Sequence, residues 1–290
     1  MAKSKVLLFL VLFLVGVGLT PKYVTEKAKD VLKSSDLIFV DSYTMPNVKT
    51  FLDYVKTFLD YKEIFIAKRD LLENNSNEII NLAKSKNVSI IILGDPMIAT
   101  THESLLIEAK KMGVKSEIVN GVSGICVAKS ISGLQYYRFG KTLTIPGKWR
   151  KTKAYSILYG LYGNLCLDLH TFFLFDIDEE GKSLKISEGI NYLLQLNNEI
   201  SGFKELSELL GIIIHAGESN IVDVNTLHEL ANNDLKMEEP YSLAIPASLH
   251  FVEEEYLKYI LNADSNKIIK HKQMLKEDFC DYATKIKGLL

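Results

Sequence analysis

The chain has 290 residues, of which 47% are hydrophobic and 24% charged, and its formal net charge at pH 7 is −2. This composition is typical of a globular protein, and the length is sufficient for two domains with substantial cores. Because neither sign of charge is in large excess, the chain has no bias toward polyanions. We therefore do not expect nucleic acid as a direct ligand.

The spacing of the cysteines and histidines argues against a disulfide-linked protein and against a metal-binding protein. Cys126, Cys166 and Cys280 are odd in number and widely spaced, which favours neither a disulfide framework nor a Cys-x-x-Cys site and predicts a reducing, cytoplasmic setting. The six histidines contain no His-x-x-x-His or Glu-x-x-His pair. We therefore expect no metal site.

The first 21 residues allow two interpretations. Lys3 and Lys5 precede an apolar run at residues 6–15, as in a signal peptide, but the run is too short to span a membrane. The following Gly-rich segment, which ends at Pro21, is typical of a strand-to-loop turn. We predict a first strand from Leu10 onward, buried on both faces of a parallel sheet. Residues 1–9 are then an N-terminal extension, and no membrane association is expected.

From residue 24 to residue 131 the apolar pattern alternates between helix and strand periodicity. Such an alternation predicts the β-α-β order of a parallel sheet. We expect helices near residues 24–33, 48–58, 76–86, 101–112 and 123–131, and strands at residues 37–40, 63–67, 88–93 and 115–119.

The pattern breaks at residues 136–153, so we place the boundary between an N-terminal domain, residues 10–138, and a C-terminal domain, residues 139–262. In the second domain we expect strands at residues 171–175, 212–215 and 242–245, and helices at residues 187–196 and 249–261. In the last helix, Val252, Tyr256 and Ile260 should face the core and Glu253 should face solvent. Residues 263–290 are a charged C-terminal tail, predicted to be an appended helix or a mobile segment.

A Gly-Asp-Pro turn around Asp95 follows the strand at residues 88–93 and leads into a helix that Thr101 can cap. The carboxyl ends of parallel strands are where open α/β sheets bind ligands. Asp95 therefore either faces a ligand or only forms the turn. A dinucleotide site is disfavoured, because Gly16 and Gly18 are followed by Pro21 where the third glycine should stand.

Five segments, taken in order, resemble the diphthine synthases, which are members of the tetrapyrrole methylase superfamily. These segments are residues 15–19, the Gly-Asp-Pro-x-x-Ala-Thr-Thr-His stretch at 94–102, the Gly-Leu-Gln-Tyr-Tyr-Arg-Phe-Gly block at 133–140, residues 170–177, and residues 249–253. The resemblance implies two α/β domains with S-adenosylmethionine in the cleft between them, usually in a homodimer. It also implies an enzyme that methylates the amine of a modified histidine on translation elongation factor 2 during diphthamide biosynthesis.

The resemblance implies a set of cofactor contacts that is mostly apolar or glycine, as suits adenine and a thioether. The matching positions are Leu19, Asp95, Ile98, Ser123, Gly124, Ile125, Phe175, Ala216 and Tyr241. The chain departs from the family pattern at residues 122–125, which are one residue longer, at Tyr241, where histidine is more usual, and at residues 246–250, which lack a Gly-Lys pair. A corrin or porphyrin methyltransferase and a binding homologue with weakened activity therefore stay open as alternatives.

No catalytic residue is assigned from the sequence, although Asp41, Asp95 and His102 are candidates for the group that accepts a proton from the acceptor amine. A basic segment near the domain junction is a candidate docking surface for the elongation factor, with a solvated linker as the alternative. Its residues are Lys141, Lys148, Trp149, Arg150, Lys151, Lys153 and Tyr155.

Overall fold

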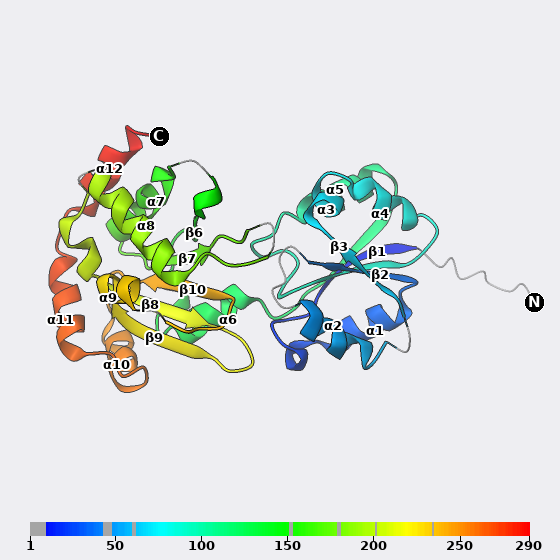
Figure 1. The fold of residues 1–290 in the computed structure, drawn as a ribbon, viewed down its shortest axis with the longest axis horizontal. Helices are drawn as coiled ribbons and strands as arrows, with labels where there is room; N and C mark the ends of the chain where they lie inside the picture. Colours follow the sequence, from blue (N-terminus) through cyan, green and yellow to red (C-terminus); the bar gives the residue numbers. More distant parts are fainter. Residues whose placement is uncertain are drawn as a thin grey trace, which may run out of the picture. The chain divides into compact units, whose positions relative to one another are not determined.

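The computed structural model describes residues 10–42, 48–59, 62–150, 153–178, 181–200, 202–233 and 235–290. It divides the chain into two compact units, Met1–Ile125 and Cys126–Leu290, each built around one sheet (Figure 1). The division falls earlier in the chain than the boundary placed after residue 138, and it lies inside the helix α6, Gly124–Ile131.

The first unit is a five-stranded parallel sheet in the order β3-β2-β4-β1-β5. Its strands are β1 Val11–Gly16, β2 Leu37–Asp41, β3 Ile64–Ala67, β4 Val88–Ile92 and β5 Lys115–Val119. Its helices are α1 Glu26–Ser34, α2 Val48–Lys56, α3 Arg69–Glu73, α4 Ser76–Leu82 and α5 Glu103–Lys111. The predicted β-α-β order is confirmed. The short helix α3, however, was not predicted.

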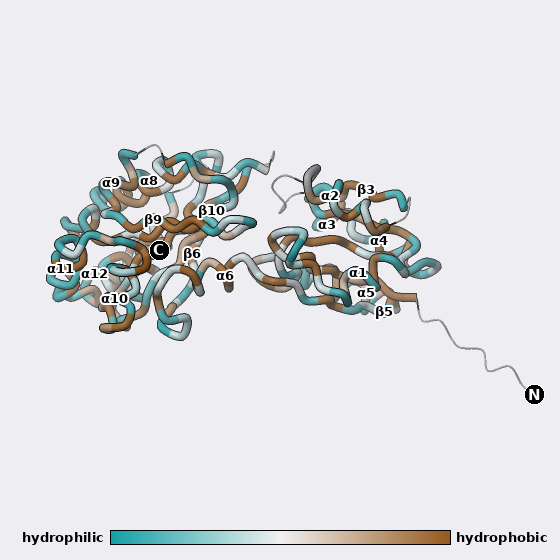
Figure 2. The backbone as a smooth tube through the Cα atoms, turned by 90° about the horizontal axis from the view of Figure 1, so that it is seen from below, coloured by the Kyte–Doolittle hydropathy of each residue, from teal (hydrophilic) through white to brown (hydrophobic). Residues whose placement is uncertain are grey.

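Helices cover both faces of this sheet, which explains the uninterrupted apolar strands. One core joins α1 and α2 to the sheet, and a second joins α3, α4 and α5 to the opposite face (Figure 1). Every residue of β4 is buried, and the hydrophobic colour in Figure 2 follows the strands. The predicted first strand is confirmed from Val11 onward, whereas residues 1–9 lie outside the described residues.

The second unit is a mixed sheet in the order β6-β7-β10-β8-β9, in which only β6 and β7 pair in parallel. Its strands are β6 Leu143–Ile145, β7 Thr171–Phe175, β8 Leu210–His215, β9 Ile221–Thr226 and β10 Tyr241–Ile245. The helices that follow α6 are α7 Tyr155–Cys166, α8 Ile186–Glu199, α9 Leu227–Asn232, α10 Phe251–Tyr259, α11 Ser265–Met274 and α12 Phe279–Lys287. The expected strands and helices are present, but β6, β9, α7 and α9 were not predicted. For α7 a physical reason is clear, because Gly160 and Gly163 lower its intrinsic helix propensity.

Of the two alternatives for the charged C-terminal segment, the helical one is confirmed, with two helices, α11 and α12, in place of one. Phe279 of α12 is buried and its ring stacks on that of Tyr162 in α7, with ring centroids 6.0 Å apart. A disulfide joins Cys166 at the end of α7 to Cys280 in α12. The expectation of no disulfide was therefore wrong. The two cysteines are 114 residues apart in sequence, and only the packing of α12 on α7 brings their Cα atoms within 4.8 Å.

Helix α10 departs from the prediction at four positions. Glu253 is 1% exposed, whereas Val252, Tyr256 and Ile260 are exposed; the apolar residue Leu257 of the same helix is buried. The Glu253 carboxylate has four hydrogen-bond partners inside the unit: Arg138, His170 and the backbone N–H groups of Gln135 and His250. A carboxylate with that many donors is stable when buried.

Candidate functional site

Glycines bring together the loops that follow three adjacent strands of the first unit, β4, β1 and β5. A Cβ atom on Gly16 would lie 2.7 Å from both Gly94 O and Gly121 N, and one on Gly121 would lie 2.1 Å from Gly94 O. Gly18 and Gly94 exchange two backbone hydrogen bonds, and both have a φ of 71°. No residue with a side chain fits at this crossing. The Gly-x-Gly pattern therefore serves close packing of loops rather than a dinucleotide fingerprint.

Asp95 links two of these loops and is 6% exposed. Its Oδ1 accepts a hydrogen bond of 2.9 Å from the Met97 N–H, which is the turn-forming bond considered from the sequence. Its Oδ2 accepts hydrogen bonds from Asn120 Nδ2 at 3.0 Å and from the Gly121 N–H at 3.3 Å. The carboxylate therefore ties the loop after β4 to the loop after β5. A cofactor contact by Asp95 stays a prediction.

The other predicted contacts in the first unit lie at the same edge of the sheet. Leu19 follows β1, and its Cδ2 is 2.9 Å from the place where a Cβ of Gly124 would be. Ser123 is buried just before α6, and Gly124 and Ile125 form the first turn of that helix. Ile98 lies in the loop after β4 and is 39% exposed.

The three predicted contacts in the second unit also share an edge of their sheet. Phe175 ends β7, Ala216 follows β8, and Tyr241 begins β10 between those two strands. Because β10 runs antiparallel to both neighbours, its start lies beside their ends. The rings of Phe175 and Tyr241 meet edge to face with centroids 5.2 Å apart. The Tyr241 hydroxyl donates to Leu184 O at 2.9 Å, and burial raises the pKa of Tyr241 to about 12.

Two exposed residues of the basic segment are paired with carboxylates. Arg150 donates from Nε and Nη2 to the two oxygens of Asp176, at 2.7 and 2.8 Å. Lys153 pairs with Glu199 at 2.8 Å. Lys151 lies outside the described residues. The docking role of this segment stays a prediction, and Arg150 is better explained as a structural partner of Asp176.

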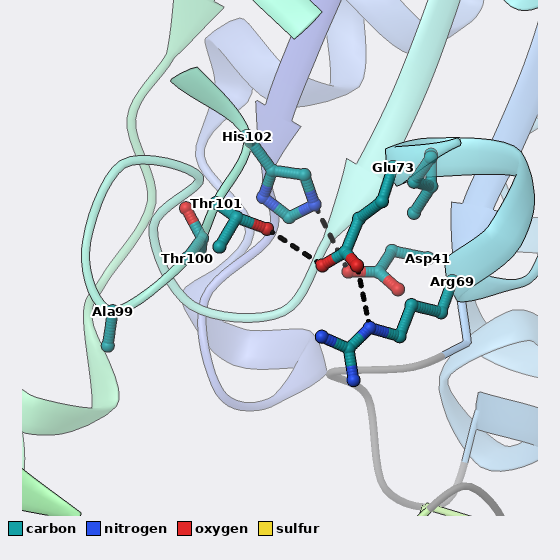
Figure 3. Close-up of a pocket in the computed structure, with 8 residues that line it drawn as sticks. Asp41, Arg69, Glu73, Ala99, Thr100, Thr101 and His102 are labelled. Atoms are coloured by element: carbon teal, nitrogen blue, oxygen red, sulfur yellow. Dashed lines mark hydrogen bonds and ion pairs between the residues drawn. The ribbon is translucent and has the colours of Figure 1, made fainter. Parts of the chain in front are cut away.

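A cavity of about 220 Å³ lies in the first unit, beside the carboxyl end of β2 (Figure 3). It is lined by Asp41 from β2, by Arg69, Leu72 and Glu73 from α3, and by Ala99, Thr100, Thr101 and His102 from the loop before α5. Two of the three candidate proton acceptors meet in this cavity, because His102 Nε2 lies 3.3 Å from Asp41 Oδ2.

Thr101 does not cap α5 as the sequence predicted. Its hydroxyl donates to Glu73 Oε1 at 3.1 Å, and the N-cap of α5 is His102, which makes no side-chain capping bond. Arg69 Nε donates to the other oxygen of Glu73 at 2.7 Å. The Thr101–Glu73 bond ties α3 to the loop before α5, whereas the Arg69–Glu73 pair lies within α3, as Figure 3 shows. Arg69 and Glu73 were not predicted as site residues, because α3 itself was not predicted.

Comparison with known proteins places these features in a family. The tetrapyrrole (corrin/porphyrin) methylases match residues 11–200. The chain is 36% identical to the diphthine synthase of Aeropyrum pernix over 250 residues, which cover 84% of this chain and 85% of that protein. It is also 36% identical to the diphthine synthase of Methanopyrus kandleri over 261 residues, which cover 86% and 95%. The chain belongs to the diphthine synthase family.

Solved structures agree with this membership of the diphthine synthase family. A conserved hypothetical protein from Aeropyrum pernix has a TM-score of 0.83 at 33% identity, with 93% of this chain and 98% of that chain covered. A crystal structure of diphthine synthase has a TM-score of 0.78 at 26% identity, with 91% and 99% covered. The expected pair of α/β domains is therefore confirmed as the fold of this family. The chain is a methyltransferase, and the family uses S-adenosylmethionine.

Two of the family segments have a structural role that the sequence did not reveal. Arg138 and the Gln135 N–H from the 133–140 block both donate to Glu253 of the 249–253 segment. In the altered segment 246–250, the Ser248 N–H and hydroxyl both donate to Asp168, at 3.0 and 2.7 Å. These segments hold α10 against the second unit. Among the described residues, no group of three or more His, Cys, Asp or Glu side chains could hold a metal ion.

Proposed function

We propose that this chain transfers methyl groups from S-adenosylmethionine to the amine of the modified histidine of elongation factor 2, in diphthamide biosynthesis. The observation that carries the proposal is the meeting of Leu19, Asp95 and Ser123–Ile125 on the loops after β1, β4 and β5. The resemblance to the diphthine synthases implies these positions as cofactor contacts. Contacts of the donor with Phe175, Ala216 and Tyr241 stay a prediction.

The side chains at this edge fit the donor chemically. S-adenosylmethionine carries a sulfonium cation, a flat base and an apolar thioether arm. Of the six predicted contacts in the first unit, only Asp95 is charged, and it is negative. Leu19, Ile98 and Ile125 offer apolar surface, and Gly124 leaves backbone accessible at the start of α6. Such a mixture suits a pocket that positions a cation without competing positive charges.

Methyl transfer from a sulfonium to an amine requires little covalent catalysis by the protein. When bound, the donor supplies a methyl group activated by the sulfonium. The apolar side chains of Leu19 and Ile98 exclude water, which would otherwise solvate the cation and the amine. The rigid glycine crossing and the Asp95 bonds fix the loops, so that the reactants meet in line with little loss of freedom at the moment of reaction.

Donor binding is tested by calorimetry with S-adenosylmethionine and with its demethylated product. Gly124→Ala should weaken binding at least tenfold, about 1.4 kcal/mol, because the new Cβ would lie 2.9 Å from Leu19 Cδ2. Gly163→Ala is the matched control, since nothing lies within 4 Å of a Cβ there. Absence of binding by the parent chain, or equal binding by both variants, would contradict the donor site.

The acceptor is tested by mass measurement. After incubation with the donor and unmethylated elongation factor 2, the peptide with the modified histidine should gain mass in steps of one methyl group. A parallel incubation with a corrin precursor tests the alternative substrate class. Methylation of the corrin alone would replace the proposal. Donor binding without methylation of either acceptor would identify a binding homologue.

We further infer that the protein acts as a homodimer in the cytoplasm. The outward face of α10 presents Phe251, Tyr259 and Ile260 at 67%, 66% and 60% exposure, and large exposed apolar patches mark interaction surfaces. The cytoplasm is where an elongation factor is found. No helix among the described residues has the length and apolarity to cross a membrane.

A further inference from the structure

None of the residues that line the cavity beside β2 is one of the nine predicted cofactor contacts, but its lining residue Ala99 directly follows the predicted contact Ile98 on the loop after β4. Its volume of about 220 Å³ is below the roughly 300–1,000 Å³ of pockets that enclose a whole drug-sized ligand. It therefore has room for one small group of a larger molecule. Ala99, which lines the cavity, has a φ of 58°, a left-handed conformation that is uncommon for a residue other than glycine.

The charges around the cavity favour a cation over an anion. Among the described residues, two carboxylates, Asp41 and Glu73, line it together with one permanent cation, Arg69. Arg69 already pairs with Glu73 at 2.7 Å. With His102 neutral, the lining carries one net negative charge. An ammonium group is stabilised in such a site, whereas a phosphate or carboxylate would meet two negative side chains.

The Asp41–His102 pair has the geometry of a proton acceptor. Both side chains are buried, at 1% and 6% exposure, and Asp41 Oδ2 lies 3.3 Å from His102 Nε2 (Figure 3). When the imidazole is neutral and Nε2–H donates to the carboxylate, the free lone pair lies on Nδ1. The carboxylate holds this tautomer and stabilises the imidazolium that forms on protonation, as in the carboxylate–histidine pairs of hydrolases.

The Nδ1 atom of His102 has no hydrogen-bond partner within the described part of the chain, although it is buried. An unmade hydrogen bond at a buried polar atom is unfavourable, so such atoms are uncommon in folded proteins and need an explanation. A ligand N–H group would supply the missing donor. The cavity, its charge and this unpartnered atom therefore point to the same kind of ligand.

We propose that the acceptor amine enters this cavity, where Asp41 is its counter-charge and His102 Nδ1 takes its proton. The inference rests on the proposed function. The N–H bond of the ammonium breaks, its electron pair stays on nitrogen as the nucleophilic lone pair, and the proton passes to Nδ1. The imidazolium is stabilised by Asp41 and returns the proton to water after methyl transfer. Arg69 and Glu73 are the other charged groups that line the cavity with this pair.

The test uses His102→Gln, which can still donate to Asp41 but cannot take a proton. Its rate of elongation factor methylation should fall about 10²-fold or more at neutral pH, the usual contribution of a general base. The rate should recover as pH rises, because water then deprotonates the amine. Donor affinity by calorimetry should not change. His228→Gln, in the exposed part of α9, is the matched control and should retain the parent rate and pH profile.

A second measurement works without the donor and does not depend on a folded variant. A short elongation factor peptide with the modified histidine is titrated into the parent chain labelled with ¹⁵N-histidine. The ring nitrogen signals of His102 should shift, and those of His228 should stay fixed. Unmoved His102 signals in the presence of bound peptide, or a parent-like pH profile for His102→Gln, would overturn this inference. Failure of the parent to bind donor or methylate the factor would instead overturn the proposed function.

Discussion

Asp95 illustrates how far a single residue can be understood from sequence. The Gly-Asp-Pro turn correctly predicted a corner at the end of β4. The two hydrogen bonds that its Oδ2 accepts from Asn120 and Gly121 could not be predicted, because they depend on the neighbouring position of β5 and its loop. The carboxylate has a turn-forming oxygen and a loop-bridging oxygen. Any contact with a cofactor would be added to these roles.

Glu253 illustrates the opposite case, in which sequence pattern misleads. Three consecutive glutamates in a helix are typical of a solvated face, yet the first of them is buried. Burial opposes its ionisation, but hydrogen bonds from His170 and from the N–H groups of Gln135 and His250 lower the pKa of Glu253 to about 2. The residue therefore stays charged and holds β7, α10 and the 133–140 block together.

This pKa predicts acid sensitivity of the second unit. The folded-state pKa of about 2 is below the ordinary value of 4.5, so the stabilisation is complete above pH 4.5 and is lost as the pH falls from 4.5 toward 2. The full contribution is about 3 kcal/mol, at roughly 1.4 kcal/mol per pKa unit. Denaturant unfolding of the parent and of Glu253→Gln at pH 7 and pH 3 measures it.

The difference in unfolding free energy between the two chains should be smaller at pH 3 than at pH 7. Glu254→Gln is the control, since Glu254 pairs only with Lys272 on the surface and exposed pairs contribute about 0–1 kcal/mol. An equal loss for Glu253→Gln at both pH values would show that the charge of Glu253 does not stabilise the fold.

At the scale of elements, the C-terminal segment is folded into two helices, α11 and α12. The sequence of residues 263–290 has little apolar periodicity, so a tail was a reasonable prediction. In the structure, Phe279, Ala283 and Ile286 of α12 are buried in the core of the second unit. The disulfide fixes α12 on α7, and it closes a loop that contains most of the unit.

Reduction of the Cys166–Cys280 disulfide should destabilise the second unit. A cross-link over 114 residues removes chain entropy from the unfolded state, and losing such a bond costs about 2–5 kcal/mol. Denaturant unfolding with and without a reducing agent measures the effect, and Cys166→Ser should reproduce it. Cys126→Ser is the control, because Cys126 is a free cysteine. A parent chain that unfolds identically in both conditions would contradict a stabilising role.

At the scale of the whole molecule, the exposed apolar face of α10 predicts self-association. Phe251→Ser and Ile260→Ser together should convert a dimer into a monomer in sedimentation experiments, with a shift of at least tenfold in the dissociation constant. Ile107→Ser is a matched control, since Ile107 is also exposed at 55% but lies on α5 of the first unit. A parent chain that sediments as a monomer at micromolar concentration would rule out the α10 interface.

The sequence by itself determined the elements of the first unit other than α3, the Gly-Asp-Pro corner and the family, because apolar periodicity and turn chemistry act over a few residues. The loops that should carry the cofactor contacts came from the family resemblance, and these contacts stay a prediction. Only the tertiary structure showed that Asp41 and His102 form a pair that lines a cavity, that Glu253 is buried, and that Cys166 pairs with Cys280. Each of these depends on residues far apart in sequence, and their contacts arise only when packed elements place donors, acceptors and thiols side by side.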